Sequence, residues 1–173
     1  MQELNQHISV DCVILSFFNS ELHVLLIDRN TTWKEGEKIK SGFSLIGYHV
    51  YENEEIDEAS YRILKDIAGI KDIALHQFGV FASPLRLEKL KEKGHRVITV
   101  AYYGLVNPDK IPRQSLGKGV SWFPLKDLEK MDLVLDHEKI IKSARRKLKE
   151  ELFMGPEILF DLLPVKFTTG MLQ

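Results

Sequence analysis

The chain has 173 residues, of which 44% are hydrophobic and 28% are charged, and its formal net charge at pH 7 is -1. This length suits one well-buried domain and is short for two. The near-neutral charge excludes a broad basic field of the kind that attracts nucleic acid, and the single cysteine, Cys12, excludes an internal disulfide or a zinc site built from cysteines.

The apolar runs are too short for a membrane span, which needs roughly twenty residues. The first of them, residues 8–18, contains Asp11 and lacks the basic leader and the cleavage site of a secretion signal. We therefore expect a cytoplasmic protein that contacts no membrane.

The first part of the chain predicts a hairpin followed by a third strand. Residues 8–18 and 22–28 are rich in β-branched and apolar side chains, and three polar residues separate them. The continuous apolar run from Val24 to Ile27 is typical of a strand that is covered on both faces. Residues 43–47 then predict a short strand.

Residues 47–70, GYHVYENEEIDEASYRILKDIAGI, have the pattern of a loop, a helix and a glycine stop. Asp57 is predicted to cap a helix over residues 57–68. Gly69 is predicted to adopt the left-handed conformation that ends a helix.

Three further strands are predicted in the second half of the chain, over residues 73–82, 96–106 and 120–124. Tyr102 and Tyr103 are consecutive in the second of these strands, so their side chains must point to opposite faces. Only one of them can therefore face a given pocket.

A final helix is predicted from Asp136, as its cap, to about Phe153. Its many basic side chains lie near Glu150 and Glu151, so a solvated helix face is favoured over a nucleic-acid surface. The charged segment 85–95 predicts a short helical or hairpin excursion.

The stretch 47–70 resembles the box of the Nudix hydrolases, which reads Gly, five residues, Glu, seven residues, then Arg-Glu-apolar-any-Glu-Glu-any-Gly-apolar. Three of its positions are retained, as Glu54, Arg62 and Gly69, and Tyr48 stands at the first glycine. The three clustered glutamates of the box are replaced by Ile63, Asp66 and Ile67. The resemblance implies an α/β fold, the Nudix-like α/β/α sandwich with a mixed β-sheet.

In Nudix enzymes this glutamate cluster holds Mg²⁺ or Mn²⁺ against a diphosphate. Ile63, Asp66 and Ile67 lie three and four residues apart, so they share one helix face. The isoleucines either cover the former metal face or are ordinary core positions of an amphipathic helix. Both interpretations predict that this face binds divalent metal poorly, so no cofactor is expected; Glu54 and Asp66 are the ligands that remain if Mg²⁺ or Mn²⁺ binds at all.

Stretches outside the box resemble one branch of the family, the Nudix-related transcriptional regulators of NAD and sugar catabolism, including arabinose-responsive ones. This resemblance divides the chain into a Nudix-like domain, residues 1–155, and a segment, 156–173, that would lead to a winged-helix domain absent from this chain. We expect a homodimer that contacts DNA only through that absent domain.

Eight side chains are candidates for contacting a small-molecule ligand. Arg29, Arg86 and Arg96 match arginines of the regulator branch, and an arginine suits either a phosphate or sugar hydroxyls. The complete candidate set is Arg29, Tyr48, His49, Arg62, Phe81, Arg86, Arg96 and Tyr102. No catalytic residue is assigned.

These observations favour a catalytically silent effector-binding domain of a transcriptional regulator, which senses a sugar or nucleotide-sugar such as a pentose or ADP-ribose. One alternative is a metal-dependent hydrolase of a nucleoside diphosphate derivative. The other is an interaction module without a ligand, in which Tyr48, Ile63 and Ile67 fill the old cleft. Because two of the three clustered glutamates have become isoleucines, the balance is against an enzyme.

Overall fold

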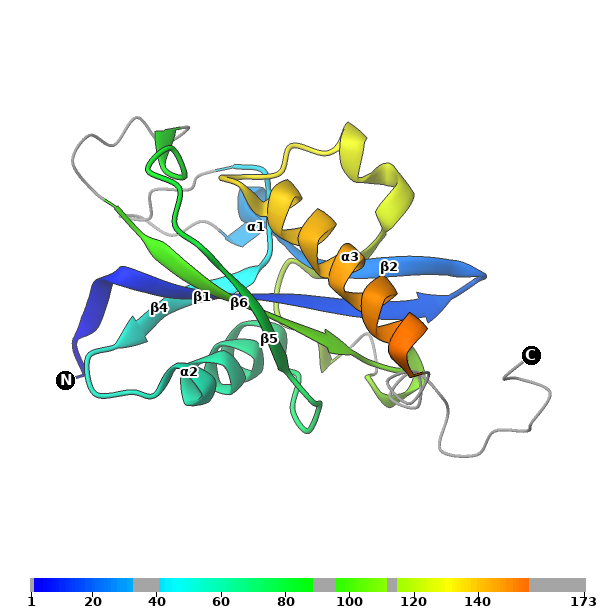
Figure 1. Ribbon diagram of the computed structural model, residues 1–173, viewed down its shortest axis with the longest axis horizontal. Coiled ribbons are helices and arrows are strands. Elements are labelled where there is room, and N and C mark those ends of the chain that lie inside the picture. The colour runs from blue at the N-terminus through cyan, green and yellow to red at the C-terminus, as the bar shows by residue number, and fades with distance from the viewer. Residues whose placement is uncertain (1, 33–40, 89–95, 112–114, 156–173) are drawn as a thin grey trace.

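The structure is a computed structural model that describes residues 2–32, 41–88, 96–111 and 115–155 (Figure 1). Its strands are β1 (Leu4–Phe18), β2 (Glu21–Asp28), β3 (Phe43–Ser44), β4 (Ile46–Tyr51), β5 (His76–Phe81), β6 (Ile98–Leu105) and β7 (Val120–Pro124). Its helices are α1 (Arg29–Thr32), α2 (Ile56–Ile63) and α3 (His137–Met154). One π-helical turn (Leu64–Ala68) continues α2, and 3₁₀ turns are formed by Pro108–Lys110 and Leu125–Lys130.

The long strand β1 lies at the centre of a mixed sheet, which has seven strands in the described part of the chain. One end of β1 pairs antiparallel with β4 and the other end with β2, while β6 runs parallel along its opposite edge. β7 and β3 extend the sheet beyond β2, and β5 forms the edge beyond β6. The predicted mixed sheet is confirmed.

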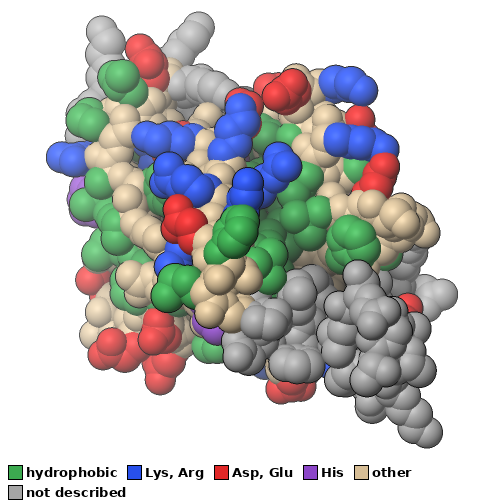
Figure 2. Space-filling model, turned by 45° about the vertical axis from the view of Figure 1, so that its right-hand side comes forward, with side chains coloured by type: hydrophobic (Ala, Val, Ile, Leu, Met, Phe, Trp, Pro, Cys, Tyr) green, Lys and Arg blue, Asp and Glu red, His purple; other side chains and the backbone are tan. Residues whose placement is uncertain are grey.

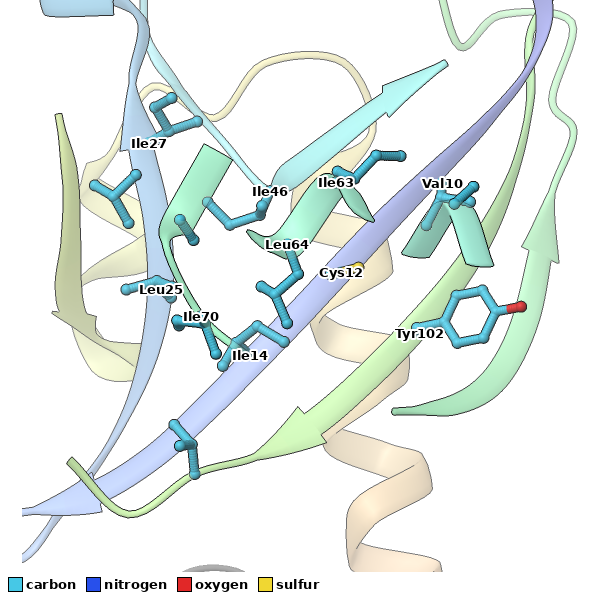
Figure 3. Close-up of a cluster of buried hydrophobic side chains, with 14 of the residues drawn as sticks. Val10, Cys12, Ile14, Leu25, Ile27, Ile46, Ile63, Leu64, Ile70 and Tyr102 are labelled. Atoms are coloured by element: carbon cyan, nitrogen blue, oxygen red, sulfur yellow. The ribbon is translucent and has the colours of Figure 1, made fainter. Parts of the chain in front are cut away.

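The two faces of the sheet carry separate hydrophobic clusters, because successive side chains of a strand point to opposite faces. Val10, Cys12 and Ile14 of β1 face the cluster that includes α2 (Figure 3). Val13 and Leu15 face the cluster that includes α3. The two helices therefore cover opposite faces, as predicted for an α/β/α sandwich.

The predicted hairpin is confirmed, with a tighter turn than expected. Phe18 pairs with Glu21, so only Asn19 and Ser20 form the turn. Both have positive φ, 52° and 61°, as a two-residue turn between twisted strands requires. β2 is covered on both faces along its apolar run, as predicted.

The prediction that Asp57 caps the box helix is wrong. The residue at the cap position is Glu55, which makes no side-chain cap hydrogen bond, and Asp57 lies in the first turn. There its carboxylate accepts a hydrogen bond from the Tyr102 hydroxyl, a partner across the chain that local sequence does not show. Gly69 does end the helical segment, with φ of +73°.

Asp136 does occupy the cap position of α3, but its side chain makes no cap hydrogen bond, because it binds Arg86 instead. Segments 89–95 and 156–173 lie outside the described residues, so the predictions for them stay predictions. None of the described helices has the length and apolar character needed to cross a membrane.

Candidate functional site

The loop before α2 is held by an ion pair between Glu54 and Arg62. Arg62 Nε lies 2.5 Å from Glu54 Oε1 and Arg62 Nη2 lies 2.7 Å from Glu54 Oε2, so the two planar groups meet as a fork. The same Nη2 donates to the carbonyl of His49 at 3.2 Å, and the guanidinium lies 4.2 Å from the centre of the Tyr51 ring. Hydrogen bonds from Arg62 hold the pKa of Glu54 below its usual range, so this carboxylate is ionised and already occupied.

The three positions that replace the clustered glutamates differ in burial. Ile63 has an exposed fraction of 1% and belongs to the hydrophobic cluster under α2. Ile67 is partly buried against the same cluster, whereas Asp66 is exposed. The isoleucines thus contact the core, as the interpretation of them as core positions expects.

The box helix widens after Ile63 to a π-helical turn, Leu64–Ala68, which contains Asp66 and Ile67. A π turn inserts one extra residue per turn relative to an α-helix. The loop before β7 contacts the end of this turn, because Gly117 N donates a hydrogen bond to Ala68 O at 3.2 Å. A Cβ on Gly117 would collide with Ile67 O, so this close approach requires glycine.

Tyr102 joins the sheet to the first turn of α2. Its ring is buried, and its hydroxyl donates to Asp57. Burial and this hydrogen bond raise the pKa of Tyr102. Tyr103, the next residue, belongs to the cluster on the opposite face, and its hydroxyl donates to Glu151 of α3. The prediction that these tyrosines face opposite ways is confirmed.

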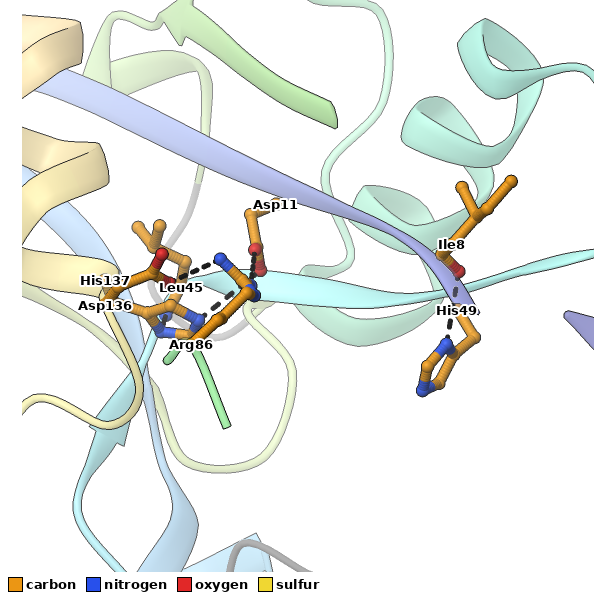
Figure 4. A network of polar contacts seen from close by, with 7 residues as sticks. All are labelled: Ile8, Asp11, Leu45, His49, Arg86, Asp136 and His137. Atoms are coloured by element: carbon orange, nitrogen blue, oxygen red, sulfur yellow. Dashed lines mark hydrogen bonds and ion pairs between the residues drawn. The ribbon is translucent and has the colours of Figure 1, made fainter. Parts of the chain in front are cut away.

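A buried charge network lies on the other face of the sheet, between β1 and the start of α3 (Figure 4). Arg86 has an exposed fraction of 4% and lies between Asp11, whose Oδ2 is 2.5 Å from Arg86 Nη2, and Asp136. His137 Nε2 lies 3.6 Å from Asp11 Oδ1, and its Nδ1 accepts a hydrogen bond from Leu45 N at 3.0 Å. The network therefore ties β1, the loop after β5, the segment before β4 and α3 together.

The two carboxylates of this network respond differently to their surroundings. Burial acts to raise the pKa of Asp11, but His137 and Arg86 outweigh it and hold the pKa below its usual range. Burial raises the pKa of Asp136 above its usual range, and the nearby Asp11 carboxylate adds to this although Arg86 acts to lower it. Gly47 makes room for the network, since a Cβ at this position would collide with Asp11 Oδ1 and lie 2.7 Å from Val10 O.

An open groove of about 570 Å³ runs between β5 and α3, next to this network. One wall is formed by β5 and the residues after it. The other wall is formed by the side of α3 that carries Lys139, Ser143 and Arg146. Its lining comprises Phe78, Gly79, Val80, Phe81, Ala82, Ser83, Asp136, Lys139, Ser143, Arg146, Lys147 and Glu150. Its volume lies within the usual range for small-molecule sites, about 300–1,000 Å³.

The structure separates the eight predicted ligand residues into different groups. Phe81 lines the groove, Arg86 binds the lining residue Asp136, and Arg96 Nη2 donates to the carbonyl of Ala82 at 2.8 Å. These three residues therefore lie around the end of β5.

The other predicted residues lie elsewhere. Tyr48 is 43% exposed on β4, and His49 Nδ1 lies 3.1 Å from the carbonyl of Ile8, away from the charge network in Figure 4. Arg62 contacts the His49 carbonyl, so these residues form a second group, beside α2. Tyr102 bonds Asp57, and Arg29 Nε donates to Ser44 Oγ at 2.8 Å. Ligand contact by all eight residues stays a prediction.

Sequence reasoning missed the charge network and most of the groove. Asp11 carried a usable signal, because a lone carboxylate within an apolar strand is rarely buried without a partner. Asp136 and His137 gave no such signal, since an aspartate before a helix is normally interpreted as a cap. Phe78 and Lys139 became groove residues only through the pairing of β5 and the position of α3.

Comparison with known proteins finds a curated ADP-ribose pyrophosphatase and several solved structures with the same fold. The chain is 30% identical over 143 residues to an ADP-ribose pyrophosphatase of Methanocaldococcus jannaschii, an alignment that covers 83% of this chain and 75% of that protein. A mutT/nudix family protein from Listeria innocua superposes with a TM-score of 0.71 at 25% identity, covering 86% of this chain and 98% of the other.

NrtR from Shewanella oneidensis has the same fold. It superposes with a TM-score of 0.74 at 23% identity, covering 97% of this chain and 74% of NrtR. Its NUDIX domain, solved in complex with ADP ribose, superposes with a TM-score of 0.67 at 24% identity and covers 83% of this chain and 89% of that domain. The NUDIX domain model matches residues 5–143, and the chain therefore belongs to the NUDIX family.

Proposed function

We propose that this NUDIX domain binds a nucleotide-sugar of the ADP-ribose type without hydrolysing it, and that it serves as the effector-binding part of a transcriptional regulator. One observation carries the proposal. Ile63, which stands where the box has its first clustered glutamate, is 1% exposed and packs into the core beneath α2. An alkyl side chain in that place supplies no oxygen to a metal and no base to a water molecule.

The residues around the box fit poorly to Mg²⁺ or Mn²⁺. Magnesium requires six oxygen ligands in near-octahedral geometry, usually with one or two carboxylates. Both carboxylate oxygens of Glu54 are bound by Arg62. The other two clustered box positions beside Asp66 are the isoleucines Ile63 and Ile67, which offer no oxygen ligand. Among the described residues, no group of three or more His, Cys, Asp or Glu side chains is placed to hold a metal ion.

The ligand class is supported by the relatives. The NUDIX domain of NrtR was solved with ADP ribose, and the relative from M. jannaschii is an ADP-ribose pyrophosphatase. The regulatory role is supported by NrtR, which was also solved with a 27mer DNA. In this proposal, DNA contact belongs to a further domain, and the response to ligand comes from unequal affinity for two arrangements of a dimer.

Two measurements on the same protein test the proposal. Isothermal titration calorimetry against ADP-ribose should show saturable binding, and arabinose, the leading pentose candidate, is titrated alongside it. Chromatography of ADP-ribose incubated with the protein and Mg²⁺ or Mn²⁺ should recover the nucleotide intact. Release of AMP at a rate that scales with protein concentration would overturn the proposal, as would absence of ADP-ribose binding by folded protein.

Hydrolysis of ADP-ribose is the second candidate, because the relative at 30% identity is an ADP-ribose pyrophosphatase and because Glu54 and Asp66 retain carboxylates at box positions. In this case Asp66→Asn should abolish turnover, since it removes the carboxylate that remains at one of the three clustered box positions. Lys65→Gln, which alters the neighbouring exposed residue, is the matched control and should leave turnover unchanged.

A further inference from the structure

The helix α2 covers only part of its face of the sheet. The side chains of Val10 and Cys12, on the central strand, are fully buried in the cluster that includes α2. Tyr102 of β6 lies at the margin of this cluster in Figure 3. Further out, two apolar side chains are accessible, because Val80 of β5 is 57% exposed and Ile98 of β6 is 36% exposed.

Strand register places these exposed side chains on one surface. Val80 pairs with Val100, and directly paired residues point to the same face. Val100 packs, partly buried, against the cluster under α2, and Ile98 lies two positions before it on the same strand. Ile8, also partly buried there, pairs with Ile98. These four residues form the β5–β6 apolar surface. Val80 also borders the groove, because β5 is the edge strand.

The β5–β6 apolar surface has opposite charges at its two ends. Where β6 begins lies Arg96, which is exposed and donates from Nη2 to the carbonyl of Ala82, just after β5. The other end, beside Tyr102, is the first turn of α2. There Asp57 accepts the Tyr102 hydrogen bond, and Glu58 follows as an exposed neighbour. The two ends lie about 13 Å apart along β6.

The α3 face and the sheet edge differ from this surface. Figure 2 shows many Lys and Arg side chains on the α3 side of the molecule, and such side chains favour contact with water. The edge of β5 is interrupted by the register shift between Gln77 and Gly79, and a bulge of this kind opposes pairing with a further strand. A partner therefore fits against the side chains of the β5–β6 apolar surface and does not extend the sheet.

We infer that the β5–β6 apolar surface is the contact between two copies of this chain in a symmetric dimer. In such a dimer the same surface of both copies meets around a two-fold axis, so the surface must complement itself. With the axis near Val80, Arg96 of each copy lies against Asp57 and Glu58 of the other. The apolar centres then meet each other, and charged residues surround them, as is usual in protein interfaces.

A second copy fits this surface better than an unrelated partner does. An unrelated partner would need a matching acid and base on either side of an apolar centre, whereas a second copy supplies them by symmetry. The inference rests on the proposed function in one respect, the dimer, to which it gives a contact surface. Complementary charges of this kind fix the register of the two copies.

Sedimentation velocity of the full chain tests the apolar centre. The wild type should form a dimer that dissociates on dilution, because the apolar centre is small for an obligate interface. Val80→Glu places one carboxylate of each copy near the axis and should raise the dissociation constant of the dimer about hundredfold. Phe17→Glu is the matched control. Phe17 is a 53% exposed strand residue that pairs with Leu22 on the α3 face, so its change should leave the dimer nearly unaffected.

The charged ends are tested by exchange between copies. Arg96→Glu and Glu58→Arg should each weaken their own dimer about tenfold, because like charges then face each other at both ends. An equimolar mixture of the two variants should form a mixed dimer with nearly the affinity of the wild type, since an acid again faces a base at both ends. Circular dichroism checks that each variant is folded.

A wild type that stays monomeric at about 100 μM would overturn the inference, and so would a dimer that Val80→Glu leaves unchanged. Oligomers that keep growing with concentration would exclude a two-fold contact. A mixture of Arg96→Glu and Glu58→Arg that associates no better than either variant alone would also overturn the inference.

Calorimetry with ADP-ribose on the same wild-type samples separates this inference from the proposed function. Monomeric wild type that binds ADP-ribose would overturn the dimer contact and leave ligand binding intact. A dimer that Val80→Glu dissociates, but that fails to bind ADP-ribose, would support the contact and overturn the proposed function.

Discussion

The two faces of the sheet hold their helices by different means. On the α2 face, the contacts are mainly apolar, and the ion pair of the loop, Arg62 with Glu54, keeps exposed side-chain fractions of 22% and 10%. On the α3 face, Arg86 and Asp11 are almost fully buried, with exposed side-chain fractions of 3% and 5%. The position of α2 therefore depends on hydrophobic contact, whereas the start of α3 depends on charge balance.

This difference explains how the box helix keeps its place with isoleucines at two of the three clustered positions. A face that collects carboxylates needs a cation to balance them. A face that carries Ile63 and Ile67 is stabilised by burial alone. The buried charge network lies instead around the loop after β5 and the start of α3, next to the groove.

The largest effect is expected from Arg86→Met. Methionine fills similar space but leaves the carboxylates of Asp11 and Asp136 buried without their cation. Breaking one side of a buried ion pair costs about 3–5 kcal/mol, so the free energy of unfolding should fall by that amount. Urea denaturation followed by circular dichroism measures it.

Lys142→Met is the control for Arg86→Met, because it breaks an ion pair of α3 whose partner, Glu138, is exposed. Its unfolding curve should superpose on that of the wild type. If the two variants lose similar stability, the buried network does not hold α3, and the contrast between the two faces disappears.

The next largest effect is expected from Ile63→Glu, which tests the α2 face. This change removes a buried apolar side chain and places a carboxyl group among alkyl neighbours, so it should cost about 3 kcal/mol. Ile67→Glu, at the partly buried position, should cost clearly less. An Ile63→Glu variant that stays as stable as the wild type and hydrolyses ADP-ribose with Mg²⁺ would show that this face is a ligand face.

Gly47→Ala should have an intermediate effect on the α3 face. The added Cβ collides with Asp11 Oδ1 and with the Val10 carbonyl, which belongs to the central strand and cannot move away cheaply. Overpacking of this kind costs about 1–3 kcal/mol. Gly79→Ala is the control, because its Cβ would meet only the Phe81 ring at 3.4 Å. Equal melting temperatures for both variants would contradict the tight fit around Asp11.

Much of the fold was predictable because it depends on local patterns. Alternating and β-branched residues identified the strands, and Gly69 marked the end of the box helix. The positions of Tyr102 and Tyr103 on opposite faces followed from the period of a strand.

The remainder depends on contacts between residues far apart in the chain. Asp57 and Asp136 both looked like helix caps, but their carboxylates bind Tyr102 and Arg86, which lie 45 and 50 positions away. Both partners are brought to these carboxylates by tertiary folding, which the local sequence does not show. The groove was likewise hidden, because a one-residue bulge at Phe78 reverses the side of the sheet that the strand pattern predicts.

Tyr102→Phe should have the smallest effect, and it tests the hydrogen bond that joins β6 to the first turn of α2. Loss of the hydrogen bond to Asp57 should cost about 1 kcal/mol at neutral pH. The pKa of Tyr102 is raised in the folded protein, so above about pH 10 the unfolded chain loses this phenolic proton first. Stability of the wild type should therefore fall as pH rises past that point, because the folded state then binds more protons than the unfolded state.

In Tyr102→Phe this part of the alkaline decline should be absent, so the two unfolding curves should converge between about pH 10 and pH 11. Tyr61→Phe, which changes a ring that is 47% exposed, is the control and should decline as the wild type does. Superposed curves for the wild type and Tyr102→Phe at all pH values would mean that the hydroxyl of Tyr102 contributes nothing to holding α2. The box helix would then be fixed by apolar contact and by the Arg62–Glu54 pair, and the two faces would differ even more than their burial indicates.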